Sequence, residues 1–148
     1  LIDWFDEDKL NEIINQKWDY AEKPPKILII FYDVVASLEK NMKNFLKLVY
    51  NRRHILGSCS IMLITKVYNK IPLEIRKVAQ GLILFSTGNK RELDSVYEDC
   101  SMLKREVYDQ VLRYCFKDAH DFCYFDVTDN KYYRNFNELK FDDNSISV

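Results

Sequence analysis

Three uninterrupted apolar runs punctuate the first two thirds of the chain. They cover residues 27–31, 60–65 and 81–86, with the sequences ILIIF, SIMLIT and GLILFS. None shows the polar alternation of a strand with one face in water, so each predicts a strand buried on both faces, as in a parallel sheet.

Helical periodicity separates these runs. Apolar residues spaced three and four apart predict helices over 6–18 and from about 37 to 49, and Pro72 fits the first turn of a short helix through Lys77. Asn89 followed by Glu92 is a capping-box start for another helix, and a further one is expected from about 104 to 116. The segments DFCYFDV and KYYRNF flank TDN and predict a closing antiparallel hairpin.

This order of elements predicts an α/β chain with a mostly parallel sheet and a C-terminal β-hairpin. With 148 residues, 47% of them apolar and 14% aromatic, the simplest expectation is one domain, residues 1–140, followed by a flexible tail, residues 141–148. The net charge of −1 provides no global basic field, so any nucleic-acid contact must come from a local patch. No apolar run approaches the roughly 18 residues of a membrane span, and no membrane partner is expected.

The four cysteines show no CxxC pair and no histidine at zinc-site spacing. We expect buried, reduced thiols, which suits a reducing compartment such as the cytosol.

Polar residues follow each apolar run, and ligands of parallel sheets bind at the carboxyl ends of the strands. The loops expected to meet there are Tyr32-Asp33, Thr65-Lys66 and 86–89. Asp33 could hold magnesium or orient an attacking water, or it could simply cap the segment that follows.

Several segments that follow one another in a fixed order along the chain narrow the functional interpretation. They are ILIIFYDVVASL, then RRH, IMLITKVYNKIPLEIRK, GLILFSTGNKREL and the closing KYYRNFNELK. From about residue 4 to residue 140 the chain resembles the poxvirus-type DNA-packaging ATPases of large double-stranded DNA viruses, members of the FtsK/HerA superfamily. Pro72 and Arg76 match the family's Pro-x-x-x-Arg segment, and Asn89, Glu92 and Leu93 match its helix start.

The resemblance implies the carboxyl-terminal part of a P-loop NTPase-like three-layer fold, with ATP and magnesium as cofactors in intact relatives. It places Tyr32, Asp33 and Thr65 at the nucleotide, Asp33 at the metal, and Asp33, Lys66 and Arg53 in catalytic positions. Arg52, Arg53 or Arg76 could act as an arginine finger across a subunit interface. The implied partners are double-stranded DNA and other copies in a ring, and the implied location is the virion or a viral factory in the host cytoplasm.

Three departures from the family pattern bear on activity. The chain has no G-x-x-x-x-G-K-[ST] phosphate loop, Tyr32 stands where the family has its first acid, and Lys66 stands where it has a glutamine. A neutral phenol is a poor magnesium ligand, and an ammonium cannot accept a hydrogen bond from water. We therefore expect that the chain alone does not hydrolyse ATP efficiently.

Other interpretations stay open at this point. Lys66 could be a solvated loop charge, and residues 52–54 could be a charged surface turn or could contact DNA phosphates. The aromatic and basic residues of 131–136 could stack on bases or pack against a helix. The alternative function is a non-catalytic α/β interaction or DNA-holding subunit derived from the same family.

Overall fold

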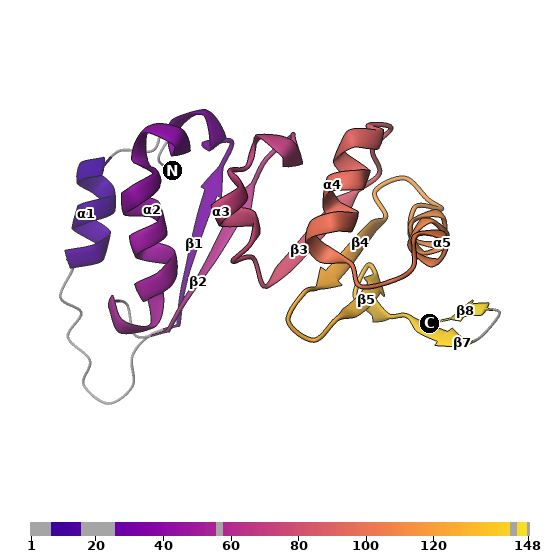
Figure 1. Ribbon diagram of the computed structural model, residues 1–148. Helices are drawn as coiled ribbons and strands as arrows, with labels where there is room; N and C mark the ends of the chain where they lie inside the picture. Colours follow the sequence, from indigo (N-terminus) through magenta and orange to yellow (C-terminus); the bar gives the residue numbers. More distant parts are fainter. Residues whose placement is uncertain (1–6, 16–25, 56–57, 143–144, 148) are drawn as a thin grey trace. The chain divides into compact units, whose positions relative to one another are not determined.

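The computed structural model describes residues 7–15, 26–55, 58–142 and 145–147. The chain divides into two compact units, Leu1–Pro72 and Leu73–Val148. We call them the N-terminal unit and the C-terminal unit (Figure 1).

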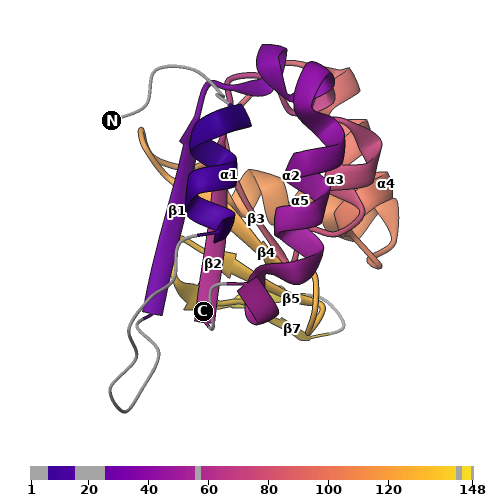
Figure 2. The ribbon, with the colours of Figure 1, turned by 90° about the vertical axis from the view of Figure 1, so that its left-hand side faces the viewer.

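The N-terminal unit is built around two parallel strands. Its elements are α1 (Glu7–Asn15), β1 (Lys26–Tyr32), α2 (Val35–Ile55), β2 (Ser58–Ile64) and the 3-10 turn η1 (Tyr68–Lys70). β1 and β2 pair in parallel along their whole length, from Lys26 opposite Ser58 to Tyr32 opposite Ile64. Helices α1 and α2 lie on the same side of this pair (Figures 1 and 2). The predicted helices and strands of this part of the chain are thus confirmed, within the described residues.

The two faces of the β1–β2 pair differ in burial. On the α2 side, the ring of Phe31 packs edge-on against Phe45 of the helix, with 5.1 Å between centroids. On the other face the apolar side chains are exposed: Leu28, Ile30, Tyr32, Met62 and Ile64. We call these five residues the open apolar face. The prediction that these strands are buried on both faces was therefore wrong here. An apolar run indicates side chains that favour a protein interior, but it does not show whether another layer of the fold covers them.

The C-terminal unit carries an antiparallel sheet. Its elements are α3 (Leu73–Arg76), β3 (Gly81–Phe85), α4 (Lys90–Cys100), α5 (Arg105–Cys115), β4 (Phe122–Asp126), β5 (Lys131–Arg134), β6 (Asn137–Glu138), β7 (Lys140–Asp142) and β8 (Ser145–Ser147). The sheet order is β3-β4-β5-β6, and every neighbouring pair is antiparallel.

The predicted terminal hairpin is confirmed as β4–β5, whereas the partner of β3 was not foreseen. β3 pairs antiparallel with β4, from Gly81 opposite Asp126 to Phe85 opposite Phe122. The fold is therefore mixed α/β, with a parallel pair in one unit and a four-stranded antiparallel sheet in the other. The expectation of a mostly parallel sheet is corrected accordingly.

The core of the C-terminal unit lies between this sheet and helices α4 and α5. The ring of Phe125 contacts Tyr108 of α5 at 6.2 Å and Tyr132 of β5 at 5.7 Å between centroids, and all three side chains are buried. For Tyr132, within the 131–136 segment, packing is thus the correct interpretation. The segment predicted as a flexible tail contains the antiparallel pair β7–β8, and its flexibility stays a prediction.

Candidate strand-end site

The carboxyl ends of β1 and β2 lie side by side in the N-terminal unit. Tyr32 is the last residue of β1 and is paired with Ile64, the last residue of β2. The backbone N–H of Asp33 donates to the carbonyl of Ile64 at 2.9 Å, which fixes the first residue beyond the strand. Asp33 has a φ of 52°, in the left-handed region that aspartate tolerates better than most residues with a side chain.

An ion pair spans the two strand ends. The Nζ of Lys66 lies 3.1 Å from Oδ2 of Asp33, and the two side chains are 77% and 47% exposed. The hydrogen bond to Asp33 raises the pKa of the Lys66 ammonium. Among the described residues the Asp33 carboxylate therefore contacts the neighbouring strand end, and no hydrogen bond from it to the start of α2 is present.

Thr65 and Tyr32 complete this site. With Asp33, Ile64 and Lys66 they line a hollow of about 60 Å³. The Oγ1 of Thr65 accepts a hydrogen bond from the backbone N–H of Val67 at 3.3 Å, which turns the chain away from β2. Tyr32 is 66% exposed and belongs to the open apolar face. The structure thus brings together four residues singled out from the sequence: Tyr32, Asp33, Thr65 and Lys66.

The chemistry of these side chains fits magnesium poorly. Magnesium is usually held by one or two carboxylates together with substrate phosphates and water. Asp33 is the one carboxylate lining the hollow, and the Lys66 ammonium already contacts it. In the described part of the chain, no group of three or more His, Cys, Asp or Glu side chains is placed to hold a metal ion.

The arginines considered as fingers are not brought to this site by any described contact. The backbone of Arg53 lies in α2, but its side chain lies outside the described residues. The neighbouring Arg52 donates from Nη1 to the carbonyl of Val49 in its own helix at 2.9 Å. Arg76, of the Pro-x-x-x-Arg segment, forms an ion pair with Asp99 of α4 inside the C-terminal unit.

The third predicted loop, residues 86–89, serves the start of α4. The Oδ1 of Asn89 accepts from the backbone N–H of Arg91 at 3.1 Å, so the predicted cap is confirmed. The carboxylate of Glu92, which is buried, accepts from Oγ1 of Thr87 at 3.2 Å. The polar groups of this loop therefore stabilise a helix end.

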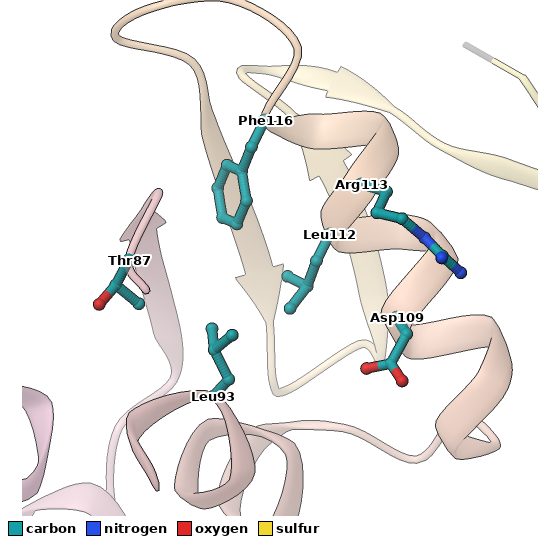
Figure 3. A pocket seen from close by; sticks show the side chains of 6 residues that line it. All are labelled: Thr87, Leu93, Asp109, Leu112, Arg113 and Phe116. Atoms are coloured by element: carbon teal, nitrogen blue, oxygen red, sulfur yellow. The ribbon is translucent and has the colours of Figure 1, made fainter. Parts of the chain in front are cut away.

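A larger hollow, about 450 Å³, lies in the C-terminal unit (Figure 3). It is lined by Thr87, Leu93, Asp109, Leu112, Arg113 and Phe116. Leu93, Leu112 and Phe116 point towards one another, whereas the Arg113 side chain extends away from them (Figure 3). A ligand site normally adds convergent polar groups to such an apolar lining, and this hollow lacks that convergence.

Comparisons with protein-family models, with curated proteins and with solved structures found no match for this chain. None of the helices in the described ranges combines the length and apolarity that a membrane span requires. Any functional proposal therefore depends on the geometry of the chain and on its motifs.

Two groupings in the C-terminal unit escaped prediction. Cys115, at the end of α5, and Cys123, in β4, are both buried, and Arg134 bridges Asp118 and Asp121 at 2.9 and 2.7 Å. No spacing in the sequence indicates either, because both depend on how α5 packs on the β4–β5 hairpin.

Proposed function

We propose that this chain is a degenerate or partial viral DNA-packaging ATPase domain, which contributes the strand-end part of a nucleotide site and does not hydrolyse ATP by itself. The observation that carries the proposal is the pairing of Asp33 with Lys66 at 3.1 Å across the carboxyl ends of two adjacent parallel strands. Ligands of parallel α/β sheets bind at this edge.

The finer features implied by the motifs belong to this proposal. They are a P-loop NTPase-like three-layer arrangement, ATP and magnesium bound in intact copies, and assembly into a ring that drives double-stranded DNA into a capsid. The open apolar face supports a further covering layer, because parallel strands in α/β proteins are normally covered on both faces.

The same ion pair accounts for the expected lack of turnover. A carboxylate that orients or deprotonates water must accept its hydrogen bond, and the Lys66 ammonium competes with water for Oδ2 of Asp33. The Lys66 ammonium is nonetheless exposed, so a phosphate could approach it as a point charge. Weak nucleotide binding without hydrolysis is the expected behaviour.

Amide chemical shifts of the isotope-labelled chain, titrated with magnesium-ATP, test this proposal. We expect shifts centred on Asp33, Thr65 and Lys66, and phosphate release no faster than in buffer. Lys66→Gln, which restores the residue that the resembled family has at this position, should weaken these shifts, because it removes the charge that would attract a phosphate and leaves a neutral amide.

Lys131→Gln is the matched control for this substitution. Lys131 belongs to another exposed pair, with its Nζ 3.3 Å from Glu138 in the C-terminal unit. Its replacement should leave the ATP-induced shifts unchanged. Shifts confined to other parts of the chain, or equal losses in both variants, would contradict a nucleotide site at the strand ends.

The open apolar face favours one second candidate, a non-catalytic interaction or DNA-holding subunit of the same family. Five exposed apolar side chains on one sheet face are typical of a surface that another protein covers. The net charge of −1 gives the chain no overall positive field, so its total charge does not favour DNA binding. No ATP-induced shift at millimolar nucleotide, together with self-association that Ile30→Lys removes, would favour this candidate.

A further inference from the structure

The open apolar face changes in bulk along its strands. In the register of β1 with β2, the cross-strand pairs are Leu28–Ser60, Ile30–Met62 and Tyr32–Ile64. Side chains two residues apart on a strand point to the same face, so the three pairs lie side by side on the side opposite α1 and α2 (Figure 2). The face is therefore low at the Leu28–Ser60 pair and bulky at the Tyr32–Ile64 pair.

The area of this face is enough for an interface. Its five apolar side chains are 40–66% exposed. A large side chain presents about 200 Å² when fully exposed, so these five leave roughly 500 Å² of surface open in each chain. Two such faces in contact would bury about 1,000 Å² from these residues alone, which is the level expected of a specific interface.

The shape of the face is complementary to itself in one orientation. A two-fold axis through the Ile30–Met62 pairs of two copies places their strands antiparallel, one sheet over the other. The bulky Tyr32–Ile64 pair of each copy then covers the low Leu28–Ser60 pair of the other. A parallel alignment would instead oppose the two bulky ends and leave a gap between the two low ends.

Lys26 adds charge complementarity to the same orientation. It is exposed on the same face as Leu28 and is the one charged residue within β1 and β2. In the antiparallel alignment it lies just beyond Tyr32 of the second copy, next to the Asp33 carboxylate, which is 47% exposed. The two-fold axis generates this attraction twice.

We propose that two copies of this chain form a symmetric dimer through their open apolar faces, with antiparallel β1–β2 pairs packed face to face. The second copy supplies the layer that covers these strands. The dimer goes beyond the proposed function, because it depends on the strand faces and requires no nucleotide at the strand ends. It is therefore tested in the absence of ATP, where a failure leaves the nucleotide site undecided.

Sedimentation of the full chain over a series of concentrations tests the dimer. We expect a monomer–dimer equilibrium with a Kd of micromolar order, as for small interfaces. Ile30→Lys should raise the Kd by about a hundredfold or more, because the two-fold axis would bury two charges together. The matched control is Ile83→Lys, at an isoleucine of β3 that is 40% exposed in the C-terminal unit, and it should leave the Kd unchanged.

A milder variant keeps the test independent of folding. Lys26→Glu alters an exposed position and should raise the Kd by about threefold at low salt, since it places two carboxylates together at each end of the interface. Lys40→Glu, at an exposed position of α2 on the opposite side of the strands, should have no effect.

The orientation has its own measurement. In a sample that mixes labelled and unlabelled chains, intermolecular NOEs should join Tyr32 of one copy to Leu28 of the other. A monomer at millimolar concentration, a dimer that Ile83→Lys weakens as much as Ile30→Lys, or NOEs that join the two Tyr32 rings to each other would overturn the proposal. A monomer in which the five side chains are protected from water would show that another part of the same chain covers the face.

Discussion

In the N-terminal unit the ion pair at the strand ends is exposed, whereas two ion pairs of the C-terminal unit, Arg76–Asp99 and Arg134–Asp121, are largely shielded from water. Lys66 and Asp33 are 77% and 47% exposed, while Arg76 and Asp99 are 17% and 15% exposed. An exposed pair contributes little to stability, and a shielded one is costly to break. The same residue types therefore have different roles in the two units.

The contrast extends to their surroundings. Arg76 connects α3 to α4, and Arg134 connects β5 to the loop before β4, so each shielded pair joins two separate segments of the unit. Lys66 and Asp33 follow strands that are already paired through their backbones. The N-terminal pair is therefore not needed to join its two strands, whereas the two shielded pairs of the C-terminal unit hold separate segments together.

The largest effect is expected from Arg76→Gln, which leaves the shielded Asp99 without its charged partner. We expect a loss of about 2 kcal/mol in the free energy of unfolding, below the value for a fully buried pair. Urea unfolding followed through the amide signals of α4 measures it. Arg91→Gln, at an exposed position of the same helix, is the control and should change the free energy by less than about 0.5 kcal/mol. Equal effects of the two substitutions would contradict a structural role for the Arg76–Asp99 pair.

A smaller, pH-dependent effect is expected at Asp121. Hydrogen bonds from Asn135 and Arg134 lower the pKa of this carboxyl to about 2, below the ordinary aspartate value of about 3.9. The folded state thus favours the ionised form. The resulting stabilisation is present above pH of about 4 and disappears as the pH falls towards about 2.

Acid unfolding of wild type and Asp121→Asn checks this sign. Wild type should be more stable than Asp121→Asn at neutral pH. This difference in stability should disappear as the pH falls below the pKa of Asp121. Asp129→Asn, at an exposed turn position, tests whether any loss of an aspartate gives the same profile. A difference that persists unchanged to the lowest pH would show that ionisation of Asp121 is not its source.

Local features of the fold were predictable from the sequence, and long-range pairing was not. The apolar runs located β1, β2 and β3, and Asn89 located the start of α4, since both signals depend on neighbouring residues. The antiparallel pairing of β3 with β4 joins residues about forty positions apart, and apolar runs carry no information on partner or direction.

The candidate site was predictable for a related reason. Asp33 and Lys66 each follow a predicted strand directly, so parallel pairing of those two strands is enough to bring them together. The role considered for Arg76 depended on packing between helices, and its contact with Asp99 could not be foreseen.

The smallest effect is the change in the free energy of unfolding that Lys66→Gln causes, which is separate from its effect on nucleotide binding. The ammonium is exposed and the strands are held by backbone hydrogen bonds, so the urea midpoint of the β1 and β2 amide signals should not change at neutral pH. Lys131→Gln, in the exposed pair of the C-terminal unit, should behave in the same way. A clear loss of stability in Lys66→Gln alone would make the pair a structural element, and its lysine would then be unavailable to a phosphate. An unchanged midpoint combined with weakened ATP-induced shifts would instead separate ligand binding from folding at the strand ends.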